Sequence, residues 1–251
     1  MHKGNGVKVD FCIITLSFTS NLINMNRLLS SIIFAVALVA CQPAIEQGKS
    51  AIELKLEQIG LQSVAEKIPS VEVYMVYATP YNFMGRVLYE GLDEAYLVPE
   101  AMEKLRKAND ILRKKRLDLH LVVYDAARPR SIQQQMWKVV ENTELQDFVA
   151  NPNKSGGGPH NYGIAVDVTL VDCTGHPIPM GSEYDYFGNR SRVDLEAQLI
   201  EQGEINQREL LNRQLLREVM TEAGWIVEPS EWWHFNAMTL EDASQRLSVI
   251  D

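Results

Sequence analysis

Residues 159–167 read Pro-His-Asn-Tyr-Gly-Ile-Ala-Val-Asp, and the fold is organised around this stretch. The alternation in its second half predicts a strand over residues 164–171, on which Asp167 faces away from the core. His160 lies seven residues before Asp167, an odd offset that would put the two side chains on opposite faces of a straight strand. Gly163 permits a turn that returns His160 toward Asp167. The pair is then either two metal ligands or a turn histidine beside a hydrogen-bonded aspartate.

A second motif occurs near the C-terminus, where residues 231–235 read Glu-Trp-Trp-His-Phe. Glu231 and His234 are three residues apart, again an odd offset for a strand. Both side chains reach one site only if Glu231 lies in the turn that follows the Pro-Ser pair at 229–230. The alternative is a surface glutamate, two core tryptophans and a capping histidine.

Together the two motifs, His-x6-Asp and then Glu-x-x-His, resemble the zinc peptidase family that holds the D-alanyl-D-alanine dipeptidases and D,D-carboxypeptidases. The resemblance covers roughly residues 74–236 and implies a hedgehog/D,D-peptidase-like zinc fold. It implies that His160, Asp167 and His234 bind one Zn²⁺, and that Glu231 is the base that takes a proton from the activated water. Two neutral imidazoles and one carboxylate suit this chemistry, because they leave the metal with a net positive charge.

Residues 124–129, Tyr-Asp-Ala-Ala-Arg-Pro, follow the end of a predicted strand, where a side chain can lean over a pocket. The resemblance implies that Arg128 stabilises the developing oxyanion. A guanidinium suits that role, since it offers several donors and keeps its charge. The alternative is a structural arginine that bridges a carboxylate such as Asp125.

Two further segments, residues 77–85 and residues 180–187, also resemble the dipeptidases. The resemblance implies that Asp185, together with Tyr77, binds the substrate and that Asp185 holds its ammonium group. A carboxylate that pairs with an α-amine rejects acylated peptides, because an amide nitrogen carries no charge. The alternative for Asp185 is a turn aspartate that closes a loop.

One position departs from the family pattern. The family usually has serine two residues before the first histidine ligand, where this chain has Gly158. The metal ligands are unaffected, but a contact to the substrate or to a ligand is lost unless Ser155 replaces it.

The remaining pattern predicts one α+β domain over residues 61–251, with a central antiparallel sheet flanked by helices. No repeated strand–helix–strand unit is visible. Strands are expected at 71–77, 119–124, 164–171, 225–227 and 232–236. Helices are expected at 99–116, at 131–141 with Ser131 as its cap, and at 207–223 before Gly224.

The N-terminal residues have a different composition. Arg27 precedes an apolar run that ends in Leu-Val-Ala-Cys at residues 38–41, the pattern of a bacterial lipoprotein signal peptide. Cys41 is the expected lipidation site, Met25 the expected start, and residues 1–24 an extension. Residues 42–60 are expected to be a polar tether. The sequence therefore predicts an exported, periplasm-facing protein that is anchored in the membrane through a lipid.

The composition excludes one class of partner. With 24 lysines and arginines against 33 aspartates and glutamates, the 251-residue chain carries a net charge of −9. Because phosphate binding relies on basic patches, nucleic acid is not an expected partner.

Three functions remain open at this point. The first is a zinc dipeptidase that splits D-Ala-D-Ala in cell-wall turnover or scavenging. The second is a D,D-carboxypeptidase or another peptidoglycan peptidase on the same scaffold. The third is a wall-binding zinc lipoprotein without catalysis, which Glu231 and Arg128 disfavour because a structural zinc site needs no base.

Overall fold

The structure is a computed structural model that describes residues 48–154 and 157–251. The predicted start at Met25 and the lipidation site Cys41 lie outside the described residues, as do residues 42–47 of the predicted tether. None of the described helices combines the length and the apolar character that a membrane span requires.

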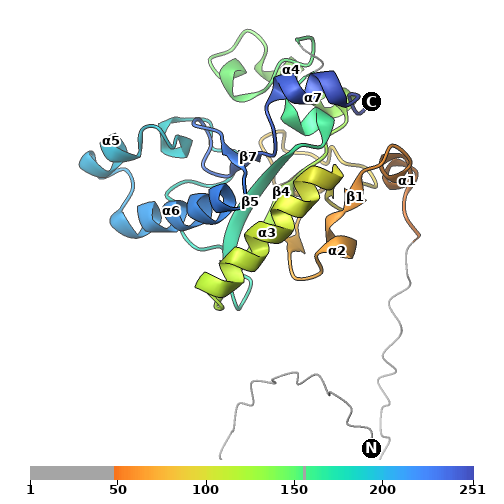
Figure 1. Cartoon of the computed structure of the whole chain (residues 1–251). Coiled ribbons are helices and arrows are strands. Elements are labelled where there is room, and N and C mark those ends of the chain that lie inside the picture. The colour runs from red at the N-terminus through yellow and green to blue at the C-terminus, as the bar shows by residue number, and fades with distance from the viewer. Residues whose placement is uncertain (1–47, 155–156) are drawn as a thin grey trace, which may run out of the picture. The chain divides into compact units, whose positions relative to one another are not determined.

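A five-stranded sheet with the order β2-β4-β5-β7-β6 forms the centre of the domain (Figure 1). Its strands are β2 (Glu72–Val73), β4 (Leu119–Asp125), β5 (Ala165–Asp172), β7 (His234–Asn236) and β6 (Ile226–Val227). A separate two-stranded sheet pairs β1 (Gln62–Ser63) with β3 (Tyr96–Leu97). The prediction of an α+β domain with a central sheet is thus confirmed.

The prediction of a purely antiparallel sheet is wrong at one edge, because β2 pairs with β4 in parallel. The connection between these two strands contains the helix α3 (Pro99–Lys115), and a long helical crossover is what a parallel pair requires. The strand predicted at 71–77 is also much shorter than expected. The chain leaves the sheet after Val73 and forms the 3₁₀ turn η1 (Val76–Ala78). This turn places Tyr77 at the wall of a cavity that is described below.

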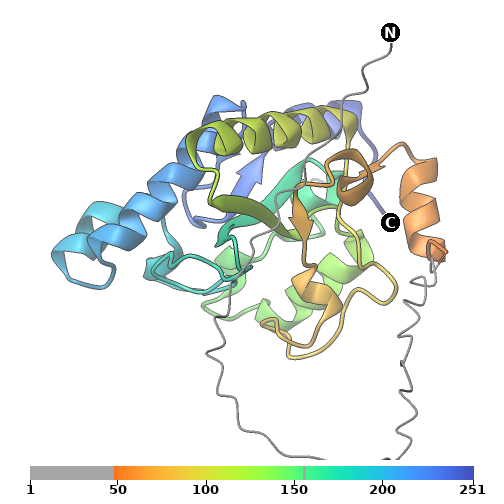
Figure 2. The same cartoon turned by 90° about the horizontal axis from the view of Figure 1, so that it is seen from below.

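Helices α3 and α6 (Gln207–Glu222) lie together on one face of the sheet (Figures 1 and 2). Both match the predicted helices within one residue. Pro99 opens α3, and the fully buried residues on its inner face are Ala101, Met102, Leu105, Ala108 and Leu112. Asn206 caps α6 together with Glu209, and the chain leaves this helix through Gly224 at φ +96°.

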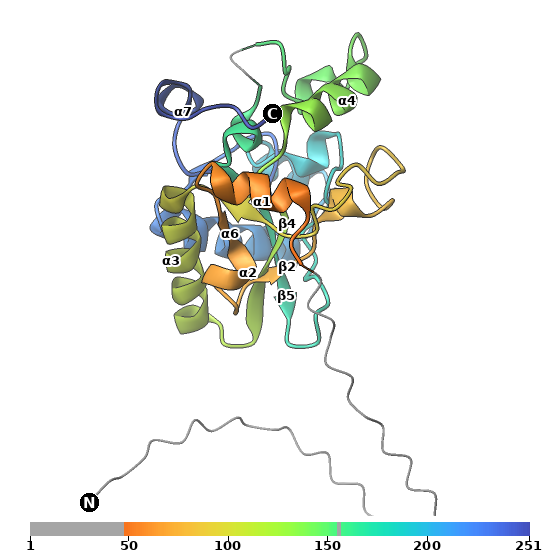
Figure 3. The same ribbon diagram turned by 90° about the vertical axis from the view of Figure 1, so that its right-hand side faces the viewer.

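Helix α4 (Arg130–Val140) lies on the opposite side of the sheet from α3 (Figures 2 and 3). The predicted cap, Ser131, is wrong, because the helix begins at Arg130 with Pro129 at the cap position. The fixed φ of Pro129 sets the entry of the chain, and Ser131 lies exposed in the first turn. The shorter helices are α2 (Val64–Lys67), α5 (Glu196–Glu201) and α7 (Leu240–Arg246), and the remaining 3₁₀ turns are η2 (Gln146–Phe148), η3 (Pro159–Tyr162) and η4 (Asn189–Ser191).

The folded domain begins earlier than the expected boundary at residue 61. Helix α1 (Ala51–Gln58) lies within the segment predicted to be a tether, and Ser50 and Glu53 form a reciprocal capping box at its start. Leu56 is fully buried in the core. The apolar contact made by Leu56 shows that residues 51–58 belong to the domain.

Candidate metal centre and substrate pocket

His160 reaches the site through a tight turn. The 3₁₀ turn η3 carries it, and Gly163 then reverses the chain into β5 with a left-handed φ of +67°. A side chain at this position would also meet Leu61, because an added Cβ would lie 2.9 Å from Leu61 Cδ2. The predicted role of Gly163 in returning His160 toward Asp167 is confirmed.

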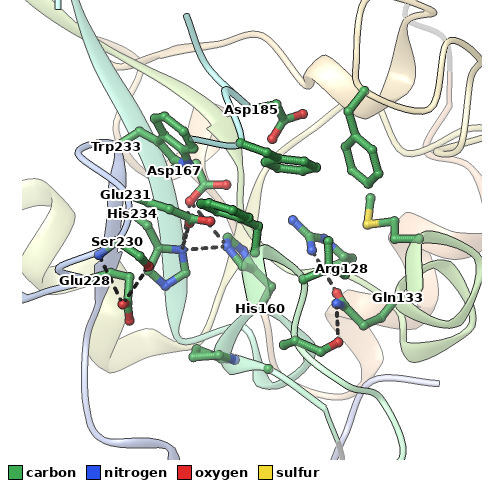
Figure 4. Close-up of a pocket in the computed structure, with 18 of the residues that line it drawn as sticks. Arg128, Gln133, His160, Asp167, Asp185, Glu228, Ser230, Glu231, Trp233 and His234 are labelled. Carbon is green, nitrogen blue, oxygen red and sulfur yellow. Dashed lines mark hydrogen bonds and ion pairs between the residues drawn. The ribbon is translucent and has the colours of Figure 1, made fainter. Parts of the chain in front are cut away.

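Asp167 and His234 come from neighbouring strands. They are directly opposite each other in the antiparallel pair β5–β7, so their side chains lie on the same face of the sheet. His234 Nδ1 lies 3.0 Å from Asp167 Oδ1 and 3.1 Å from His160 Nε2, and His160 Nε2 lies 3.3 Å from the same aspartate oxygen. The three side chains are buried and converge on one point (Figure 4).

The tautomers of the two histidines suit a metal ion. His160 Nδ1 donates to the Ala126 carbonyl oxygen at 2.7 Å, and His234 Nε2 donates to Asn236 Oδ1 at 2.9 Å. The two remaining ring nitrogens therefore direct lone pairs at each other and at a carboxylate, an arrangement that a cation stabilises. Ligand atoms about 2.0–2.1 Å from a tetrahedral ion lie roughly 3.3–3.4 Å apart, close to the separations found here. The residues fit Zn²⁺ in this respect.

The pKa shifts of Asp167 and His234 also favour a positive charge at this centre. Burial raises the pKa of Asp167, but the charge of His160 and the hydrogen bonds from both histidines outweigh it and hold the pKa far below its usual range. Burial lowers the pKa of His234, yet the hydrogen bond and charge of Asp167, with the charge of Glu231, raise it to about 9. Without a metal ion, His234 would therefore hold a proton next to the charged Asp167 carboxylate, and a metal ion would replace that proton.

Glu231 lies in the turn before β7, as predicted, and its Oε2 is 3.8 Å from His234 Nδ1. Burial is the main cause that raises its pKa to about 7, and the charges of Asp167 and Glu228 add to it. A carboxylate with a pKa near neutrality can both accept and deliver a proton at physiological pH. The geometry thus places a carboxylate that is suited to act as a general base beside the candidate metal ligands.

Arg128 follows β4 and lies across the pocket from the ligands (Figure 4). A β-bulge between Val123 and Asp125 distorts the end of this strand, and the Asp125 carboxylate binds Arg128 Nε at 3.0 Å and also its Nη2. Tyr89 adds a contact to Nε at 3.3 Å. The bridge to Asp125 that sequence analysis left open is therefore present, and the same guanidinium also lines the pocket.

Asp185 and Tyr77 meet at another wall of the same pocket. The Tyr77 hydroxyl lies 2.9 Å from both carboxylate oxygens of Asp185, and Asp185 has a left-handed φ of +59°. Desolvation raises the pKa of the Asp185 carboxyl well above its usual range, against the opposing hydrogen bond from Tyr77. The cavity has a volume of about 220 Å³, below the roughly 300–1,000 Å³ of pockets for drug-sized ligands, so it can enclose only a small molecule.

Arg213 of α6 braces the loop that carries Asp185. It is almost completely buried and donates to the backbone oxygens of Met180 and Arg190, at the two ends of that loop, the second at 2.5 Å. Burial lowers the pKa of Arg213 to about 10. The loop is thus anchored to the helical layer at both ends.

Gly158, the departure from the family pattern, sits against Ala150. A Cβ added to Gly158 would lie 2.7 Å from Ala150 Cβ, too close for the present backbone. The serine that the family usually has would therefore require Ala150 to move. Ser155 lies outside the described residues.

Three residues of the site were not found from sequence. Tyr184 donates a hydrogen bond to Asp167 Oδ2 at 2.9 Å. Asn236 accepts a hydrogen bond from His234, and Gln133 accepts one from Arg128. Asn236 had a detectable signal, since it lies two residues after His234 on a strand and so faces the same side. Gln133 had none, because its contact depends on how α4 is placed.

Comparisons with known proteins agree with this geometry. A family model described as D-Ala-D-Ala dipeptidase matches residues 57–248. A D-alanyl-D-alanine dipeptidase of Escherichia coli is 30% identical over 70% of this chain and 83% of the relative. Proteins of the same name from Synechocystis sp. and Enterococcus faecium are 29% and 26% identical, covering 62% and 71% of this chain and 74% and 91% of each relative. The chain belongs to the D-Ala-D-Ala dipeptidase family of peptidases.

Proposed function

We propose that this protein hydrolyses the free dipeptide D-Ala-D-Ala with the help of Zn²⁺ held by His160, Asp167 and His234. The observation that carries the proposal is the presence of Asp185 in the same small cavity as these ligands. In a free dipeptide the ammonium group belongs to the same residue as the scissile carbonyl, and a carboxylate in this cavity can pair with it.

The residues of the chain divide the chemistry among them. When bound, zinc acidifies a water molecule and polarises the peptide carbonyl. Glu231 takes the proton from the attacking water and delivers it to the leaving amine, which its pKa of about 7 permits. Arg128 donates to the carbonyl oxygen as negative charge develops on it. Asp185 holds the ammonium, and the Tyr77 hydroxyl orients that carboxylate.

The decisive experiment compares D-Ala-D-Ala with N-acetyl-D-Ala-D-Ala, using zinc-loaded protein that lacks residues 1–41. We expect hydrolysis of the free dipeptide only, and its loss in Glu231→Gln, which keeps the shape of the side chain but removes the base. Cleavage of the blocked peptide would indicate a D,D-carboxypeptidase instead. Hydrolysis of neither peptide would contradict the proposal and favour a wall-binding role.

We further propose that the protein is exported and anchored in the membrane through a lipid on Cys41. The support is the cationic and apolar signal pattern that ends at that residue. A periplasm-facing enzyme would meet dipeptides released from the wall, so scavenging or wall turnover is the expected role. Labelling with a radioactive fatty acid, lost in Cys41→Ala, tests the anchor, and recovery of uncleaved protein from the cytosol would contradict it.

A further inference from the structure

Gln133 on α4 has a buried side chain that forms two short hydrogen bonds. Its Oε1 accepts a hydrogen bond from Arg128 Nη1 at 2.8 Å, and its Nε2 donates to the Ala150 carbonyl oxygen at 2.7 Å. Only 1% of its surface is exposed. The orientation of the amide is unambiguous, because Arg128 can only donate and a carbonyl oxygen can only accept.

The contact with Gln133 restricts the orientation of the Arg128 guanidinium from a second side. Asp125 holds the edge formed by Nε and Nη2, while Gln133 holds Nη1 on the other side. The guanidinium has five N–H donors, so hydrogens on Nη1 and Nη2 remain for a substrate oxygen. With both edges held, the direction of those remaining hydrogens is set before a substrate arrives.

The second contact of Gln133 reaches the wall of the pocket. Phe148, Val149 and Ala150 form part of that wall, and Ala150 also packs against Gly158, two residues before His160. One side chain therefore joins the wall to Arg128. A shift of the Ala150 backbone would therefore move the Gln133 amide and, with it, the Arg128 guanidinium.

We propose that Gln133 is a positioning residue, which fixes the direction of Arg128 relative to the wall formed by residues 148–150. The inference rests on the proposed function, in which Arg128 donates to the carbonyl oxygen. It assigns no contact between Gln133 and the reacting atoms.

The test uses three variants of the zinc-loaded protein. Gln133→Met keeps the volume of the side chain but removes both contacts. Gln133→Glu keeps the acceptor for Arg128 and loses the donor to Ala150. Gln134→Met changes a neighbouring exposed glutamine on the same helix and serves as the matched control.

With D-Ala-D-Ala we expect Gln133→Met to lower kcat by about 10- to 100-fold with little change in KM, because a misdirected donor weakens only the transition state. Gln133→Glu is expected to keep kcat within about fivefold while KM rises, since only the wall is released. Zinc affinity, measured by competition with a chromophoric chelator, is expected to stay unchanged in all three variants. Equal kcat values for Gln133→Met and Gln134→Met would overturn the proposal.

A measurement without substrate separates this proposal from the proposed function. Nitrogen-15 NMR of the arginine side chains reports rotation of the Arg128 guanidinium, which we expect to be hindered in the wild type and in Gln133→Glu, and faster in Gln133→Met, where the Asp125 contact alone remains. Unchanged rotation in Gln133→Met overturns the positioning role. If the wild type does not hydrolyse D-Ala-D-Ala but rotation is released as expected, the positioning role stands and the proposed function fails.

Discussion

The substitution Asp185→Asn tests the proposed recognition of the substrate ammonium. The carboxylate lies in a small cavity and receives the Tyr77 hydroxyl at 2.9 Å. Asparagine has nearly the same shape and can still accept that hydrogen bond, but it carries no charge. The loss of one partner of a largely desolvated ion pair costs about 2–4 kcal/mol, or roughly 30- to 1,000-fold in kcat/KM.

The same substitution is expected to stabilise the protein without substrate. An aspartate in an unfolded chain has a pKa of about 3.9. Desolvation is the main cause that raises the pKa of Asp185 in the folded protein; the charges of Asp167 and Glu231 also raise it, whereas the Tyr77 hydrogen bond and the charge of Arg128 lower it. The folded state therefore binds the proton more tightly, so the carboxyl destabilises the fold as pH rises from its unfolded pKa to its folded pKa. Asparagine does not titrate, and its advantage grows over this window to about 1–3 kcal/mol.

The assay measures kcat/KM for free and N-acetylated D-Ala-D-Ala, together with urea unfolding at several pH values in one metal state. We expect the wild type to prefer the free dipeptide strongly and Asp185→Asn to lose most of that preference. Tyr77→Phe, which keeps the charge, is expected to retain it. A variant that keeps the full preference for the free dipeptide would refute the assignment, and a stability difference that does not grow with pH would refute the electrostatic argument.

Three other substitutions probe the supports of the site. Gly158→Ser is expected to lower kcat/KM about tenfold, since its Cβ would overlap Ala150, and the added substitution Ala150→Gly is expected to restore it; no rescue in the double variant would contradict this. Arg213→Met is expected to raise KM and to lower the free energy of unfolding by about 1–3 kcal/mol in urea titrations, because loop 180–190 loses both anchors. Asn236→Leu is expected to weaken zinc binding about 10- to 100-fold in chelator competition, and an unchanged affinity would exclude its role in holding a histidine ligand.

Local pattern was sufficient where an element is long and its apolar residues repeat. Helices α3 and α6 and the strands β4 and β5 were predicted within one or two residues, because each has a buried face or a buried run of its own. The two residues of β2 are too few to carry such a signal. Strand β2 became parallel because of its crossover through α3, which is a property of the whole domain rather than of residues 72–73.

The site was predictable to the extent that its geometry is local. A turn at Gly163 and a turn at Glu231 were inferred from odd strand offsets, and both turns are present. The contacts of Gln133 and Arg213 could not be inferred in this way. Each joins a helix to the backbone of a segment far away in sequence, and only the packed fold brings these groups together.

The shape of the cavity adds to the charge argument for a dipeptide over a longer peptide. Phe187 follows Asp185 by two residues and packs against Phe83 and Phe148, with ring centroids 4.9 and 5.3 Å apart. A carboxypeptidase must let the peptide chain continue beyond the residue whose carbonyl is attacked, which is the residue whose ammonium Asp185 would bind. If the substrate ammonium binds Asp185 as proposed, that direction would meet the Asp185 carboxylate and the three aromatic rings, all of which line the same pocket. Under the proposed function we therefore expect that hydrolysis of a longer peptide would require both the charge and the aromatic wall to be removed, and that neither change alone would suffice.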